Sequence, residues 1–296
     1  MGHVFASYGS CWNSGLGMSA YSTGRVALVA LGLSLGLGTA AQAADATIGQ
    51  KSATVEDWYV TIGARGVMQP SYPGSDTYDV RPGLIFSIAR ASQRNVFRSV
   101  DDNPSIALWN GKIFRAGVVG RLDWGRSESD SDRLRGMGDI DYSIEAGGFA
   151  EVYPLEWLRV RAELRYGMGG FEGVRGDLRA DAIFRDGPWR FAVGPRLSYA
   201  GSDYMQTYFG VSRDQSLMTA LLLNPLPAYQ ARSGFDKVGA TAQVNYTFDN
   251  GFEAGVFGTY GYLLGDAGNS PLVEDKSQFT AGVSLSYTFN MGPGWW

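Results

Sequence analysis

The stretch WLRVRAELRYG, residues 157–167, places a charged side chain on every second residue over much of its length. The charges are Arg159, Arg161, Glu163 and Arg165, and apolar or aromatic residues stand between them. A helix turns by about 100° per residue and would scatter these charges around its axis, whereas a strand places them on one face. The stretch therefore predicts a β-strand with one charged and one apolar face.

The same period of two recurs along the chain, for example in VRGDLRADAIFR (174–185) and WRFAVGPRLSY (189–199). Turn-forming sequences such as Asp186-Gly187-Pro188 separate the segments. Strands of about ten alternating residues joined by turns are typical of an outer-membrane barrel. We expect strands near 57–66, 80–90, 95–108, 112–124, 139–153, 157–168, 174–186, 189–200, 203–212, 235–248, 252–263 and 277–289. The sequence thus predicts an all-β, antiparallel, up-and-down transmembrane β-barrel of about twelve strands, with ten as the alternative.

Aromatic residues at the strand ends favour this barrel over a secreted β-sandwich, which would also alternate. Tryptophan and tyrosine rings concentrate at both membrane interfaces, and a sandwich has no reason to place outward-facing rings there. The expected girdle residues are Trp58, Trp124, Trp157, Trp189, Tyr246, Phe248, Tyr260, Tyr262, Tyr287 and Phe289.

The N-terminal region has the features of a secretory signal peptide. Arg25 precedes the apolar run 26–38, and Ala41-Gln42-Ala43 supplies a small-x-small cleavage site. The run is shorter than the roughly 20 residues that a membrane-spanning helix needs. We expect cleavage after Ala43, a periplasmic segment at 44–56, a barrel at 57–289 and a tail at 290–296. This organisation predicts the outer membrane of a Gram-negative bacterium, with its lipopolysaccharide, as the location.

Composition excludes several classes of site. The chain has 296 residues, a formal net charge of −4, one His and one Cys. His3 and Cys11 both precede the cleavage point, so the mature chain has no Ser-His-Asp or Cys-His arrangement and no Cys/His metal site. The acidic balance, without a basic run, offers no footprint for nucleic acid. We therefore expect no enzyme, no catalytic residue, no cofactor and no metal.

The charged face of the strands is expected to line the lumen, because an arginine on the lipid face near the midplane costs about 2–4 kcal/mol. Acidic and basic residues are nearly balanced there, which leaves an ion-selective pore lining or a cross-paired plug, and the plug is favoured for a narrow barrel. From residue 235 onward the inner face carries small uncharged groups, where any permeation path should run. The expected lumen charges are Arg115, Arg121, Asp123, Asp141, Glu145, Arg159, Arg161, Glu163, Arg165, Arg175, Asp177, Arg179, Asp181, Arg190 and Arg196.

Loop lengths raise one conflict. The long gaps 67–79, 213–234 and 264–276 fit the rule that long loops face the exterior, but strand parity places 125–138 on the periplasmic side. Either the strand count is off within 82–124 or 200–234, or 125–138 is a periplasmic feature and a candidate docking surface. In addition, Ser212-x-x-Gln215 before an apolar run resembles a capping box and predicts a short helix.

Three loop stretches resemble the MltA-interacting protein family (MipA/OmpV) of outer-membrane proteins. The first is Tyr72-Pro73-Gly74-Ser75-Asp76, the second is Tyr208-Phe209-Gly210-Val211-Ser212 with Gln215, and the third is Leu263-Leu264-Gly265-Asp266-Ala267 with Ser270-Pro271. The resemblance implies a barrel that links murein-processing partners, a lytic transglycosylase (murein hydrolase) and a murein synthase. It also leaves a narrow porin or a surface adhesin as alternatives, and it implies no catalytic residues.

Overall fold

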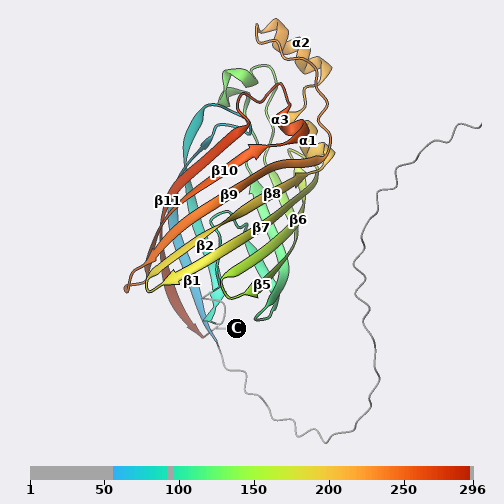
Figure 1. Ribbon diagram of the computed structural model, residues 1–296. Helices are drawn as coiled ribbons and strands as arrows, with labels where there is room; N and C mark the ends of the chain where they lie inside the picture. The colour runs from blue at the N-terminus through green and yellow to red at the C-terminus, as the bar shows by residue number, and fades with distance from the viewer. Residues whose placement is uncertain (1–55, 92–95, 294–296) are drawn as a thin grey trace, which may run out of the picture. The chain divides into compact units, whose positions relative to one another are not determined.

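The computed structural model describes residues 56–91 and 96–293, and the expected leader at 1–43 and residues 44–55 lie outside this part. The described residues form one sheet of eleven strands (Figure 1). The strands are β1 (Asp57–Pro70), β2 (Tyr78–Arg90), β3 (Ser105–Asn110), β4 (Phe114–Asp123), β5 (Ser143–Leu155), β6 (Leu158–Gly169), β7 (Gly173–Asp186), β8 (Trp189–Ala200), β9 (Gly234–Thr247), β10 (Phe252–Leu263) and β11 (Ser277–Pro293).

The sheet curls into an antiparallel barrel in which the first and last strands pair. β1 and β11 are in register from Asp57 opposite Pro293 to Met68 opposite Ala281. The strand order is β2-β1-β11-β10-β9-β8-β7-β6-β5-β4-β3, so sequence neighbours pair everywhere except at β2 and β3. This confirms the antiparallel barrel, and eleven strands agree with an expected count of about twelve.

The two faces of the strands differ as the period of two requires. Outward apolar side chains are left exposed, for example Leu164 at 62 % on β6, whereas its neighbour Arg165 is 1 % exposed. In water such an outward apolar band would be costly, and in a bilayer it meets acyl chains. The exposed apolar face includes Leu84, Phe86, Leu178, Phe184, Val193, Val256, Val283 and Leu285.

Residues 96–104, the lumen segment, run through the inside of the barrel and do not join the wall. They follow β2 and lead into β3, and both of these strands run toward the same end of the barrel. The lumen segment therefore carries the chain back between them. The expected strand at 95–108 is wrong in its first part, because this stretch places charges on both parities (Arg98, Asp101 and Asp102) and neither face could meet lipid.

The second departure is at 203–212, where an expected strand is instead helix α1 (Ser202–Phe209). Its buried residues Tyr204, Met205, Tyr208 and Phe209 follow helical spacing and pack into one apolar cluster with Phe171 and Ala200. The lumen segment adds one passage of the chain and α1 removes one. The two differences cancel, so the strands after α1 run in the directions that the sequence predicts.

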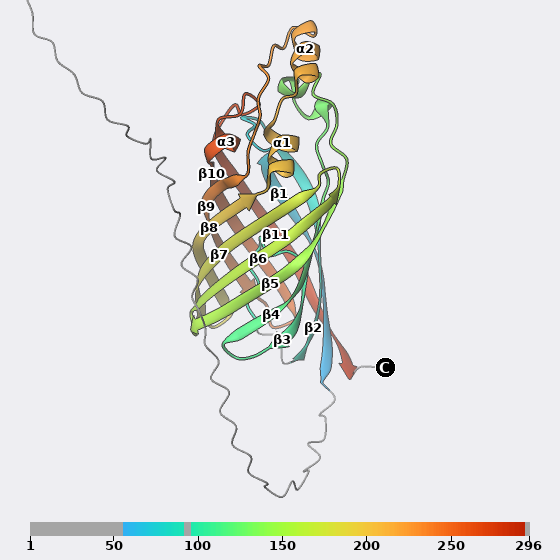
Figure 2. The same cartoon turned by 90° about the vertical axis from the view of Figure 1, so that its right-hand side faces the viewer.

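Long connections gather at one end of the barrel, here the loop end, and the short turns lie at the other, the turn end (Figure 2). Loop 124–142 belongs to the loop end, because Leu134 and Met137 pack in one cluster with Tyr72, Leu226 and Leu272. The parity argument that placed 125–138 opposite the other long loops is therefore wrong, and the strand count was off in both places. The loop-end helices are α2 (Arg213–Leu221), α3 (Gly265–Gly268) and the short 3-10 helices η2 (Glu128–Asp130) and η3 (Asp132–Leu134).

The predicted helix after Ser212 is confirmed as α2. The Ser212 hydroxyl accepts a hydrogen bond from the backbone N–H of Gln215, and the Gln215 side chain accepts one from the backbone N–H of Ser212. This reciprocal pair is the capping box that the sequence indicates. Within the described residues, the helices are all too short or too polar to cross a bilayer.

Candidate functional site

An arginine wall lines the inside of the barrel on strands β6, β7 and β8. Every second residue of each strand points inward, so the alternating sequence delivers a ladder of guanidinium groups. Most of these side chains are almost fully buried, with Arg159 and Arg165 at 1 % exposure. The wall consists of Arg159, Arg161, Arg165, Arg175, Arg179 and Arg196.

Register alone does not pair the charges of the wall. Arg161 stands opposite Arg179, and Glu163 stands opposite Asp177. Like charges directly opposite are unfavourable. Charges here instead pair with an opposite charge two residues along the neighbouring strand. Arg179 Nη1 lies 2.9 Å from Glu163 Oε1, and Arg165 donates to Asp177 at 2.7 Å.

Arg165 illustrates how completely a wall residue is paired. Its Nε donates to Glu145 at 2.8 Å, and its two terminal nitrogens donate to Glu163 and Asp177. Burying a charge is tolerated only when partners replace water. The guanidinium of Arg165 therefore joins three neighbouring strands, β5, β6 and β7.

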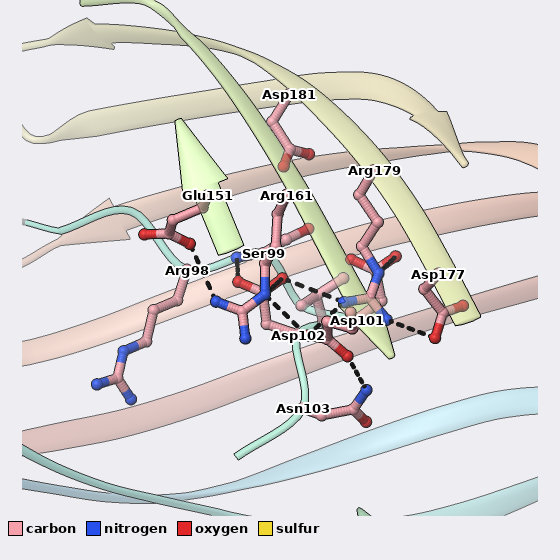
Figure 3. A network of polar contacts seen from close by, with 12 residues as sticks. Arg98, Ser99, Asp101, Asp102, Asn103, Glu151, Arg161, Asp177, Arg179 and Asp181 are labelled. Atoms are coloured by element: carbon pink, nitrogen blue, oxygen red, sulfur yellow. Dashed lines mark hydrogen bonds and ion pairs between the residues drawn. The ribbon is translucent and has the colours of Figure 1, made fainter. Parts of the chain in front are cut away.

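The lumen segment sets two further carboxylates against this wall (Figure 3). Asp102 accepts two hydrogen bonds from Arg159, at 2.7 and 3.2 Å. Asp101 accepts two from Arg196, at 2.7 and 3.3 Å. Each aspartate thus forms the two-pronged arginine–carboxylate contact that is the strongest geometry of this kind.

Other contacts fix the lumen segment to several strands at once. The backbone N–H of Val100 donates to Gln243 Oε1 on β9 at 2.7 Å, and Asn103 donates to Glu163 on β6 at 2.7 Å. The buried ring of Phe97 packs on Ile183 and Ala192. The segment therefore crosses the lumen, with charged contacts on one side and an apolar anchor at Phe97.

The wall opposite the arginines is less filled. Inward residues of β11 such as Ser284, Ser286 and Thr288 are partly exposed, whereas the corresponding residues of β5 and β6 are buried. These are the small uncharged groups at which the sequence indicated a path. Pairs such as Thr61 with Thr288, 2.9 Å apart between hydroxyl oxygens, line it.

Of the remaining expected lumen charges, the arginines are paired with acids, and Asp141 lies in a loop. Arg115 pairs with Glu151, Arg121 lies 3.5 Å from both Asp123 and Glu145, and Arg190 donates to Glu253 at 2.7 Å. Asp141 differs from the expectation, because it lies exposed in the loop before β5, outside the ion-pair network. It precedes the strand by two residues, so the alternation was extended too far.

Sequence reasoning missed several members of the network. Asp101 and Asp102 were assigned to a strand, although two adjacent charges break the period of two and could have indicated an irregular segment. Asp236, 3.4 Å from Arg175, was also missed. Arg175 additionally stacks over the ring of Tyr204 at 3.8 Å, which links the wall to α1.

The aromatic residues form two bands. At the turn end, Trp189, Tyr246 and Phe248 are in successive edge contacts, as are Phe252, Tyr287 and Phe289. Trp58 lies there as well, with the Arg90 guanidinium 5.1 Å from its ring. Trp157 precedes β6 at the turn end, whereas Trp124, Tyr260 and Tyr262 lie toward the loop end. The rings therefore mark both ends of the apolar band.

The three motif stretches, distant in sequence, meet at the loop end. The Tyr72 hydroxyl donates to Leu272 O and lies 2.9 Å from Glu274 Oε2, and burial together with this carboxylate raises its pKa. Ser270 donates to Phe209 O, and the Tyr229 hydroxyl donates to Asp266 O at 2.9 Å.

Glycine and proline of the motifs are part of the same junction. Gly74 has φ of +100°, and its carbonyl accepts from the backbone N–H groups of Glu274 and Asp275. Pro73 and Asp76 belong to the same turn and bend, and Ser75 accepts from the backbone N–H of Thr77. Gly265 begins α3 at φ of +50°. Arg133 of loop 124–142 donates to Pro271 O, so all the long loops are tied together.

The lumen segment and the hydrogen-bonded loops define the class of this protein. It is an outer-membrane β-barrel whose lumen is occupied and whose long loops are joined to one another. The family model described as "MltA-interacting protein MipA" matches residues 62–289, so the chain belongs to that family. A comparison with curated protein sequences gave no match.

Solved structures similar to the chain are barrels of the outer membrane. They include the NanC porin (11 % identity, 76 % of this chain and 98 % of that one, TM-score 0.41) and an outer membrane channel from Pseudomonas putida F1 (11 %, 83 % and 100 %, TM-score 0.41). The channel DcaP of Acinetobacter baumannii matches at 7 % identity over 79 % and 96 %, with a TM-score of 0.35.

Proposed function

We propose that the protein is an outer-membrane barrel with a filled lumen that serves as a scaffold for murein-processing enzymes, a lytic transglycosylase and a murein synthase. The name of its family supplies the partner, because it describes an MltA-interacting protein. The antiparallel barrel with its outward apolar band supports the outer membrane as the location of the scaffold.

The observation that carries this proposal is the occupied lumen. Arg159 and Arg196 hold Asp102 and Asp101 of the lumen segment by paired hydrogen bonds, and Phe97 is 1 % exposed. With eleven strands, the barrel lies between the roughly eight whose interior side chains fill and the roughly sixteen that leave a wide channel, so the lumen segment decides whether it is filled. A barrel filled in this way supports an anchoring role better than a transport role.

A periplasmic partner would meet the turn end. Long loops face the exterior in bacterial barrels and short turns face the periplasm. Exposed apolar residues lie at these turns, including Trp109 at 66 % and Ile113 at 67 %. Loop 125–138 is at the other end, so it is not proposed as the murein-enzyme contact.

The experiment is capture of a purified MltA-type lytic transglycosylase by the full chain in detergent. Wild type should capture the enzyme, and Trp109→Ser with Ile113→Ser should weaken capture. The control deletes 214–222 at the loop end, which should leave capture unchanged. Loss of capture by the loop-end deletion, or equal capture by the turn-end variant, would contradict the proposal.

A second candidate, a narrow porin, is supported by the partly exposed inner face of β11. It predicts discrete current steps from the wild-type protein in a planar bilayer. Ser286→Trp on the inner face should then reduce the step size, whereas Leu285→Trp on the lipid face should leave it unchanged. A silent wild-type protein argues against this candidate.

A further inference from the structure

The lumen segment presents its two carboxylates as a ligand would. Asp101 and Asp102 are adjacent in sequence and contact arginines from three strands: Arg159 on β6, Arg179 on β7 and Arg196 on β8. Figure 3 shows Asp101 and Asp102 beside Arg161 and Arg179 of this wall. The arginine forks bind both oxygens of each carboxylate, a geometry selective for carboxylates.

The wall retains donor capacity beyond what the segment uses. Arg161 is 3 % exposed, and its Nη2 has no hydrogen-bond partner among the described residues. Its Nε lies 3.9 Å from Asp102 Oδ1, beside the segment. The guanidinium of Arg161 stacks 3.9 Å from the Phe149 ring and donates to Glu163 and Glu151, so an acceptor oxygen at Nη2 would complete its hydrogen bonds.

Side chains, more than backbone pairing, hold the segment in place. Within it, the Asp102 backbone N–H donates to Ser99 O at 3.1 Å, and Ser99 N–H donates to the Asp102 carboxylate at 2.9 Å. No strand ladder joins the described residues 96–104 to β2 or β3. The segment can therefore leave the wall without breaking the sheet.

We propose that the arginine wall is a binding site for small solutes with two or more carboxylates, and that Asp101 and Asp102 occupy it as internal competing ligands. A dicarboxylate of similar spacing would satisfy the same forks and add acceptors for Arg161. Binding would exchange one set of charge-assisted hydrogen bonds for another, so the wall would stay neutralised. This goes beyond the proposed scaffold role, which does not require a ligand.

The test uses Ser99→Cys as a reporter. Ser99 is 6 % exposed and its hydroxyl accepts a hydrogen bond from Arg196, and the mature chain is expected to hold no other cysteine. Maleimide should label this thiol slowly, and succinate should accelerate labelling several-fold over NaCl of equal ionic strength. Ser129→Cys in the exposed loop is the matched control and should label at one rate in both. Equal rates for Ser99→Cys in the two salts would overturn the proposal.

A second pair of variants tests the site without a reporter. Asp101→Ala with Asp102→Ala vacates the carboxylate positions, and succinate should raise the unfolding temperature of this variant above that in matched NaCl. Asp101→Asn with Asp102→Asn keeps amides in those positions and should gain less. No gain for the alanine variant would overturn the proposal. Capture of the transglycosylase is read separately, so failure of the scaffold proposal would be distinguishable.

Discussion

Arg165 has no exposed side-chain surface, yet three carboxylates surround it, on Glu145, Glu163 and Asp177. Removing one partner from a buried ionic group leaves the others without compensation, and this loss exceeds the net value of the pair. The alternation in 157–167 predicted which residues face inward. It could not predict the diagonal pairing, which depends on the register between strands.

Arg165→Gln should lower the free energy of unfolding by about 3–5 kcal/mol, because three buried acids lose their shared cation. Arg185→Gln is the control, since Arg185 is exposed at the end of β7 and should change stability little. Urea unfolding in lipid vesicles measures both. Equal losses in the two variants would show that the buried network is not a special source of stability.

At the scale of elements, the loop end is a junction of four connections. Gly74 occupies a backbone conformation of φ +100°, and a Cβ there would lie 2.5 Å from Val273 Cγ2. Proline and glycine are turn formers, but nothing local to 72–76 indicates that the turn packs on Val273. The capping box gave α2 correctly because its signal is local. Helix α1 was missed because tertiary burial of Tyr204 and Tyr208 decides it.

Gly74→Ala should therefore loosen the loop end. We expect a loss of about 1–3 kcal/mol from the strained conformation, increased by the contact with Val273. Gly138→Ala is the matched control, because Gly138 also has positive φ but nothing lies within 4 Å of its added Cβ. Hydrogen exchange of loop 264–276 is the readout. Faster exchange in the control than in Gly74→Ala would contradict this interpretation.

Acid should loosen the same junction through Asp266. Hydrogen bonds from the backbone N–H and the guanidinium of Arg232 lower the pKa of this carboxyl. A lowered folded-state pKa contributes stability above the ordinary value of about 3.9, and this is lost as pH falls through the folded-state pKa. Protease cleavage near residue 232 should rise below about pH 4 in wild type. Asp266→Asn should show less change with pH over this range.

At the scale of the whole molecule, the end of the barrel at which each loop lies depends on how many times the chain passes along the barrel. The structure differs from the sequence expectation at two such passages, and the two differences cancel. Strand parity failed at 95–108, where the adjacent charges Asp101 and Asp102 could have indicated it, and again at 203–212, which only the packed structure reveals. Loop 124–142 then shares the loop end with 71–77, 201–233 and 264–276. An epitope inserted after Ser129 should bind antibody on intact cells, whereas one inserted after Asn250 should not. Binding at Asn250 alone would reverse the orientation.

The lumen segment blocks the lumen of the barrel, and conductance in a planar bilayer tests this most directly. Wild-type protein should give no discrete current steps, whereas a variant with 97–103 replaced by a Gly-Ser linker of equal length should give them. A heat-dependent shift in gel mobility verifies that both barrels are folded. Wild-type steps as large as those of the linker variant would contradict the claim.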